Sequence, residues 1–179
     1  RHDLRVDYQA TSDDFWRIVD TYQPVILVTT SRGGSIGWEI EAIEGGHGVG
    51  NAGGPELDWA SDQHGSEQLP TEASIEPRSW TAISTYRQGR TLATRLPVAA
   101  IVKATTALGV TNVQVDESGT SGNFLSGFLG LHGIYYSQLG TDPARPDVLA
   151  AGHIHVGYGL PVADASALIE ATLHAVLQA

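Results

Sequence analysis

The sequence predicts an α/β fold, a three-layer sandwich in which helices cover both faces of a mostly parallel, twisted sheet. Residues 25–30 (VILVTT) form a continuous apolar, β-branched run, which is typical of a strand buried on both faces. Residues 149–156 (LAAGHIHV) predict a second buried strand. Segments with apolar residues at helical spacing lie between such runs. Because strand and helix alternate along the chain, we expect a single α/β domain over residues 1–179.

The first predicted helix covers residues 13–21, where aromatic and apolar residues follow an acidic start. Ser12 is expected to cap this helix, and Pro24 to end it before the strand at 25–30. A glycine-containing turn is followed by residues 38–44 (WEIEAIE). Apolar and acidic residues alternate over most of this segment, which predicts a strand or a strand edge.

Residues 45–89 are rich in Gly, Pro, Ser, Asp and Glu and show little periodicity. They predict an extended loop insertion, with one further strand at 79–86. Such a long loop inside a compact domain is unusual and is often functional.

Regular structure is predicted again from Pro97, where a helix begins that Gly109 should end. A short strand follows at 111–115 (TNVQV). The glycine-rich stretch at 121–136 then opens an apolar helix with Ser126 in its first turn. The last helix is expected to begin at an Asp164 cap.

Composition excludes several classes of function. The net charge is −10 with only 10 Lys and Arg residues, which argues against a nucleic-acid partner. There is no apolar run near the roughly 20 residues that a membrane-spanning helix needs. The absence of cysteine excludes disulfides and thiolate metal sites in this sequence. Because the chain begins at Arg1 and lacks Met, we expect that an upstream segment has been removed.

Three local patterns each have a functional and a structural interpretation. Gly48 to Gly53 match GxGxxG, but no helix signal follows the glycines, which disfavours a dinucleotide site. The pair His153 and His155 could chelate zinc, or one of them could be a catalytic base at a strand end. Ser126 could cap its helix or act as a nucleophile there.

Several motifs in chain order resemble those of the pyroglutamyl peptidase I (pyrrolidone-carboxylate peptidase) family of α/β cysteine peptidases. The family segment S-x-T-A-G-T-F-V-C-N-H corresponds to residues 117–128 (ESGTSGNFLSGF), which places Ser126 at the cysteine position. The family motif G-F-I-H corresponds to residues 152–155 and places His155 at the catalytic histidine. The motif E-R-V-A-[IL]-N corresponds to residues 39–44 and places Glu39 at the catalytic glutamate.

The resemblance implies an amide or peptide hydrolase with a Ser126–His155–Glu39 triad. It implies substrate-binding roles for Arg32, Gly33, Gly34 and Leu125, and a peptide or small amide as substrate. It implies neither a metal nor another cofactor. A cytoplasmic location is expected, with a processed or secreted form as the alternative, and a homo-oligomer is a further possibility.

The sequence also departs from the family pattern. Serine replaces the cysteine, and Arg32 stands where the family has the Gln that recognises the lactam. The family's first strand and its G-F-D-P-F-G-G loop have no counterpart, so we expect a separate or cleaved N-terminal chain to complete the sheet. The 45–89 loop is longer than the family's. These departures predict a specificity altered from pyroglutamate.

Two alternatives stay open on the sequence alone. The chain could be a binding protein of the same fold, either naturally inactive or with a catalytic Cys substituted by Ser126. It could also be an unrelated α/β protein that uses His153 and His155 as a metal site.

Overall fold

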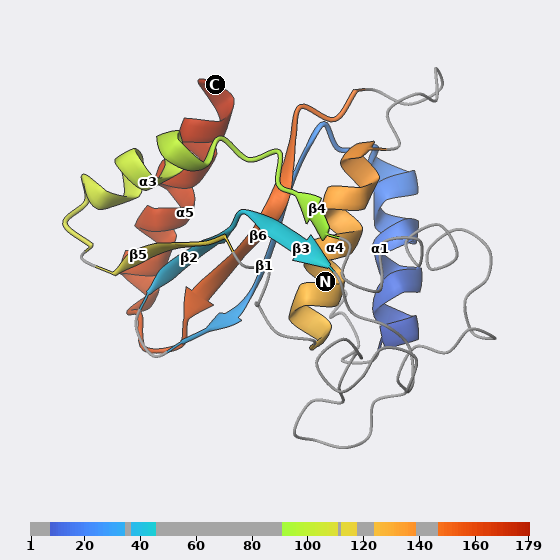
Figure 1. The fold of residues 1–179 in the computed structure, drawn as a ribbon, viewed down its shortest axis with the longest axis horizontal. Coiled ribbons are helices and arrows are strands. Elements are labelled where there is room, and N and C mark those ends of the chain that lie inside the picture. Colours follow the sequence, from blue (N-terminus) through green and yellow to red (C-terminus); the bar gives the residue numbers. More distant parts are fainter. Residues whose placement is uncertain (1–7, 35–36, 46–90, 111, 118–123, 139–146) are drawn as a thin grey trace.

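The computed structural model describes six stretches of the chain: residues 8–34, 37–45, 91–110, 112–117, 124–138 and 147–179. A four-stranded sheet forms the centre of the molecule, with helices on both faces (Figure 1). Its strands, in spatial order, are β1 (Ile26–Gly33), β6 (Ala150–Gly157), β2 (Trp38–Glu41) and β5 (Val113–Asp116). The two apolar runs therefore lie side by side as β1 and β6. β6 is buried as predicted, but β1 is at the end of the strand order and its residues are partly exposed.

The sheet is mixed but mostly parallel. β1 pairs with β6 in parallel, and β2 pairs with β5 in parallel. The central pair, β2 and β6, is antiparallel, and it brings Glu39 opposite His155. Since both parallel pairs are flanked by helices, the predicted fold class is confirmed.

In the described part of the chain, helices pack on both faces of the sheet (Figure 1). α1 (Tyr8–Tyr22) and α4 (Leu125–Gln138) contribute to a core that includes Phe15, Phe128 and Ile134. On the other face, α3 (Val98–Thr106) and α5 (Val162–Leu177) contribute to a second core. This second core contains the inward-facing Trp38, Ile40, Ile101, Ile154 and Leu168. The apolar segments predicted to be helical are therefore the ones that cover the sheet.

The strand predicted over 38–44 is divided in two. β2 ends at Glu41, and β3 (Ile43–Gly45) joins β4 (Thr91–Ala93) in a separate antiparallel pair. Ala42 lies at the break, where its N–H donates to Asp116 and its carbonyl accepts from Thr94. Gly45, the first residue of the predicted 45–89 insertion, ends β3. The rest of that loop, the predicted strand at 79–86 and the GxGxxG match lie outside the described residues.

Both predicted side-chain caps are wrong. Ser12 is a buried residue inside α1, because that helix already begins at Tyr8, and its hydroxyl contacts His132 of α4. α5 begins after Pro161, and Asp164 lies in its first turn without capping it. The predicted stop at Gly109 is confirmed by a φ of 81°, a left-handed conformation that glycine adopts without strain.

No helix in the described part of the chain is both long and apolar enough to cross a lipid bilayer.

Candidate active site

The pairing of β1 with β6 gathers polar side chains on one face of the sheet. Thr29 is in register with His153, and Ser31 is in register with His155. Because side chains alternate along a strand, these four residues share the face that α4 covers, and Arg32 leaves β1 on the opposite face. The HxH pattern thus places both imidazoles on the same side, with their rings 4.8 Å apart.

His153 is held by hydroxyl groups at both ring nitrogens. Nδ1 lies 2.7 Å from Oγ1 of Thr29, and Nε2 lies 2.9 Å from Oγ of Ser31. The Thr29 hydroxyl donates to the carbonyl of Gly152, so it accepts from Nδ1–H, and Ser31 donates to Nε2. Burial, and to a lesser extent the neighbouring His155, lowers the pKa of His153 to about 3. His153 is therefore a neutral residue with both nitrogens engaged, which suits neither a general base nor a metal ligand.

His155 is bound by carboxylates instead. Its Nδ1 atom lies 2.8 Å from Oε1 of Glu41 and 3.6 Å from Oε2 of Glu39. Both glutamates come from β2, two residues apart, and so they project from the same face of that strand. With Nδ1–H donating to a carboxylate, the neutral ring keeps a lone pair on Nε2.

The two carboxylates differ in exposure. The Glu41 side chain has no exposed surface, whereas 36% of the Glu39 side chain is exposed. Burial raises the pKa of Glu41, and the hydrogen bond and charge of His155 act in the opposite direction. The buried carboxylate is therefore the one whose charge depends most on the imidazole.

α4 runs antiparallel to β1 and β6 and presents glycines to them. A Cβ at Gly130 would lie 2.9 Å from Cβ of His153, and a Cβ at Gly133 would lie 2.9 Å from the Leu27 side chain. Ser126 is one helical turn before Gly130 and shares its side of the helix. One turn rises about 5.4 Å, and two strand residues span about 6.6 Å. Ser126 is thus placed towards the end of β6 that carries His155.

The first turn of α4 supplies backbone donors beside Ser126, which is half-buried there. The first N–H groups of a helix have no acceptor within it, and the helix dipole favours negative charge at this end. The start of α4 can therefore stabilise a developing oxyanion.

The remaining predicted site residues occupy different surroundings. A Cβ at Gly33 would lie 2.9 Å from Cβ of His155, whereas a Cβ at Gly34 would have no atom within 4 Å. Leu125 is half-buried and packs against the core beneath α4. The Arg32 guanidinium lies over the exposed ring of Tyr158, 4.7 Å from its centroid. Gly33 is thus the predicted substrate-binding residue that lies against the histidine.

Glu41 is the site residue that the sequence pattern did not indicate. In the sequence it is one of two alternating glutamates, and Glu39 occupies the position that matches the family motif. Its burial could not be recognised because its neighbours β5 and β6 lie far along the chain.

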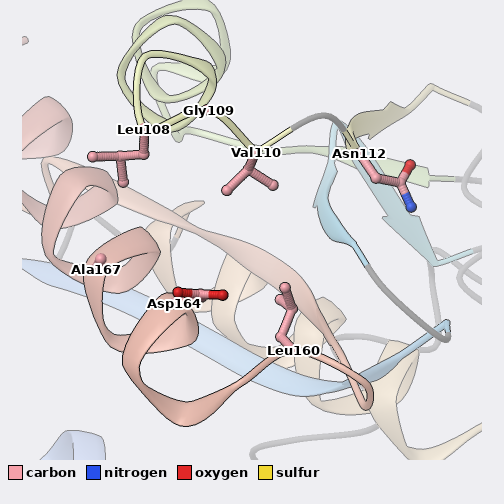
Figure 2. A pocket seen from close by; sticks show the side chains of 7 residues that line it. All are labelled: Leu108, Gly109, Val110, Asn112, Leu160, Asp164 and Ala167. Atoms are coloured by element: carbon pink, nitrogen blue, oxygen red, sulfur yellow. The ribbon is translucent and has the colours of Figure 1, made fainter.

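A cavity of about 380 Å³ lies on the other side of the sheet, between the end of α3 and the start of α5. Figure 2 shows the Asp164 carboxylate among the apolar side chains of Leu108, Val110 and Leu160. Because α3 and α5 cover the face opposite His155, this cavity lies away from the imidazole and its carboxylate partners.

Known structures resemble this chain over almost its whole length. A pyrrolidone carboxyl peptidase from Thermococcus litoralis superposes with a TM-score of 0.67 at 16% identity, covering 98% of this chain and 76% of the other. The chain has the fold of these peptidases. A pyrrolidone carboxyl peptidase from Pyrococcus furiosus gives a TM-score of 0.66 at 14% identity, covering 98% of this chain and 79% of the other.

Sequence comparisons add nothing to this structural likeness. No protein-family model matches the chain, and no curated protein sequence matches it significantly. At these identities the likeness shows a pyroglutamyl-peptidase-like fold, in agreement with the resemblance of the motifs.

Proposed function

We propose that this chain is an amide or peptide hydrolase of the pyroglutamyl-peptidase type, with Ser126 as nucleophile and His155 as general base. The observation that carries the proposal is the 2.8 Å contact between Nδ1 of His155 and the buried Glu41 carboxylate. That contact selects the tautomer in which Nε2 accepts a proton. The neighbouring histidine, His153, has no such free nitrogen, because hydroxyls engage both of its ring nitrogens.

The proposed reaction begins when Oγ of Ser126 attacks the substrate carbonyl while Nε2 of His155 takes its proton. The carbonyl π electrons move to oxygen, and N–H groups at the start of α4 stabilise that oxyanion. The tetrahedral intermediate then collapses, and the amine leaves with the proton from His155. Water, activated by the same imidazole, hydrolyses the acyl-serine ester and regenerates Ser126.

In this proposal Glu41 is the residue that positions His155, and Glu39 acts beside it. The motif comparison favours Glu39 as the residue that positions His155. Glu39 also lies opposite His155 in the β2–β6 pair. Glu41 is nearer to Nδ1 by 0.8 Å, from distances of 3.6 and 2.8 Å, and it is fully buried. A desolvated carboxylate interacts more strongly with an imidazolium than a solvated one does. We therefore assign the larger electrostatic contribution to Glu41.

The proposed specificity differs from pyroglutamate because of Arg32. A guanidinium only donates hydrogen bonds, so it suits a carboxylate or carbonyl group better than a lactam N–H. Its side chain leaves β1 on the face opposite His155 and stacks on Tyr158. We propose that Arg32 binds a part of the substrate that extends beyond the strand ends, away from the scissile bond.

The proposal is tested by hydrolysis of a panel of fluorogenic amides, with pyroglutamyl, glutamyl and neutral aminoacyl groups. We expect turnover of at least one acidic or carbonyl-rich substrate by the wild-type chain and background rates for Ser126→Ala. Equal activity of the alanine variant would reject Ser126 as nucleophile. The alternative, a binding protein of this fold, predicts no turnover by the wild type or by Ser126→Cys.

A further inference from the structure

The carboxylates around His155 form a group of potential metal ligands. Within the described residues, the group that could hold a metal ion consists of Glu39, Glu41 and His155. Their potential ligand atoms all lie within 4.8 Å of one another. We propose that this group binds a divalent transition-metal ion of the zinc type, and that the bound ion prevents His155 from acting as a base. The second part rests on the proposed hydrolase function; the first does not.

The two distances from Nδ1 of His155 fit zinc after a small adjustment. Zn²⁺ binds nitrogen and oxygen ligands at about 2.0–2.2 Å, which separates neighbouring ligands of a tetrahedral site by about 3.3 Å. The observed separations from Nδ1 of His155 are 2.8 Å to Glu41 and 3.6 Å to Glu39. One distance must open and the other must close by a few tenths of an ångström. Rotation of the partly exposed Glu39 side chain can close the longer distance, and a small shift of the Glu41 carboxylate or the imidazole must open the shorter one.

A second observation points to a ligand at the same place. Oε2 of Glu41 is buried and has no hydrogen-bond partner within the described part of the chain. A buried carboxylate oxygen without a partner is costly. A cation held by this carboxylate would offset that cost, and it would neutralise the two negative charges that Glu39 and Glu41 carry when both are ionised.

The donor set leaves room for a further ligand. Two carboxylates and one imidazole are three protein ligands, which is the number found in zinc sites that keep an open position. His153 cannot complete the set, because Thr29 and Ser31 occupy its ring nitrogens. The fourth position would therefore go to water or to a group of a bound molecule. This differs from the His153–His155 chelate that the sequence pattern suggested.

Metal binding and catalysis require opposite tautomers of His155. A metal ion on Nδ1 displaces the proton from that nitrogen, so the neutral ring carries its proton on Nε2. Nε2–H cannot accept the Ser126 proton. Zinc would therefore inhibit hydrolysis by altering the base, without contacting the nucleophile.

Binding is tested by calorimetric titration of ZnCl₂ into the chelator-treated full chain. We expect one site per chain, weakened at least tenfold in Glu39→Gln, which removes one charged ligand from a partly exposed position. The matched control is His174→Ala, because the exposed Glu170 and His174 pair, 3.9 Å apart, is a competing carboxylate–imidazole site. His174→Ala should leave the tight site unchanged. Absence of binding, equal affinity in Glu39→Gln, or loss of the site in His174→Ala would overturn the proposal.

The tautomer is tested separately by ¹⁵N NMR of the imidazoles in the same titration. We expect the His155 proton to move from Nδ1 to Nε2 as zinc saturates, with parallel loss of hydrolysis that a chelator restores. An unchanged Nδ1–H signal, or full hydrolysis by the zinc-saturated protein, would refute the inhibition. If the metal-free protein hydrolyses nothing, the proposed function fails, while stoichiometric binding with the tautomer change still supports the metal site.

Discussion

Nδ1 of His155 lies 2.8 Å from the fully buried carboxylate of Glu41 and 3.6 Å from that of Glu39, which is partly exposed. Two carboxylates from one short strand therefore share a single imidazole. The antiparallel pairing of β2 with β6 creates this arrangement, because it sets Glu39 directly opposite His155. The buried and the exposed carboxylate should then make unequal contributions to the chemistry.

Replacing each glutamate separately measures that inequality. We expect Glu41→Gln to lower kcat by about 10²- to 10⁴-fold, because the neutral amide stabilises the imidazolium poorly. Glu39→Gln should cost less than about tenfold, since water screens its charge. Equal losses in the two variants would contradict the assignment.

Gly33 leaves space for His155. A Cβ there would lie 2.9 Å from Cβ of His155, so Gly33→Ala should displace the imidazole and reduce kcat at least about tenfold. Gly34→Ala is the matched control, because a Cβ at Gly34 meets no atom within 4 Å. Steady-state kinetics of both variants give the comparison. Similar kcat values for Gly33→Ala and Gly34→Ala would show that His155 does not depend on the absence of a side chain at Gly33.

The Ser12–His132 pair should stabilise the contact between α1 and α4. Nδ1–H of His132 donates to the Phe128 carbonyl, so the buried Ser12 hydroxyl donates to Nε2 at 2.8 Å. Ser12→Ala leaves that nitrogen without its partner and should lower the free energy of unfolding by about 1–3 kcal/mol. Thr21→Ala, which removes an exposed hydroxyl from the same helix, should cost less than about 0.5 kcal/mol. The free energies of unfolding are measured by urea denaturation. Equal losses in Ser12→Ala and Thr21→Ala would contradict the Ser12–His132 pairing.

Acid should destabilise the protein through its buried histidines. Burial lowers the pKa of His132 to about 4 and that of His153 to about 3. Between those values and the ordinary value near 6.5 the unfolded chain binds more protons, so stability falls as the pH falls. Each of the two histidines should lower the free energy of unfolding at pH 5 by about 2 kcal/mol relative to its value at pH 7. The raised pKa of Glu41 acts in the opposite direction.

A variant isolates the histidine contribution. His132→Gln keeps a polar group opposite Ser12 but cannot be protonated, so the stability difference between pH 7 and pH 5 should shrink by about 2 kcal/mol. His174→Ala, which removes an exposed histidine, should leave that difference unchanged. A full pH dependence in His132→Gln would show that His132 is not the group that titrates.

The sequence predicted most of the fold because its signals are local. The apolar runs that became β1 and β6, and the helix that Pro97 and Gly109 delimit, follow directly from residue type and spacing. The cap at Ser12 was predicted wrongly because residues 8–12 (YQATS) lack a clear apolar helical pattern, although they form the first turn of α1 and tertiary packing buries Tyr8. The antiparallel pairing of β2 could not be predicted, since it depends on contacts between strands more than 100 residues apart.

The candidate site was predictable in part for the same reason. The strand-end position indicated that one of His153 and His155 could be a base, and the resemblance of the motifs then selected His155 and placed Ser126 at the nucleophile position. Glu41 was missed because only its burial distinguishes it from Glu39. That burial depends on the neighbouring strands β5 and β6, which lie far along the chain. The engagement of His153 by Thr29 and Ser31 likewise follows from strand register, which spacing within one strand does not reveal. The roles of Ser126 and Glu39, and the expected upstream chain, stay predictions.

The central claim is that His155 activates Ser126, and reaction with a fluorophosphonate tests it without knowledge of the substrate. Such reagents phosphonylate serines that a neighbouring base activates. Peptide mapping by mass spectrometry should find the adduct on Ser126 in the native protein, with a rate that falls in Glu41→Gln and none after denaturation. An unmodified Ser126 in the native protein, under conditions that fully label a serine hydrolase standard, would contradict the account.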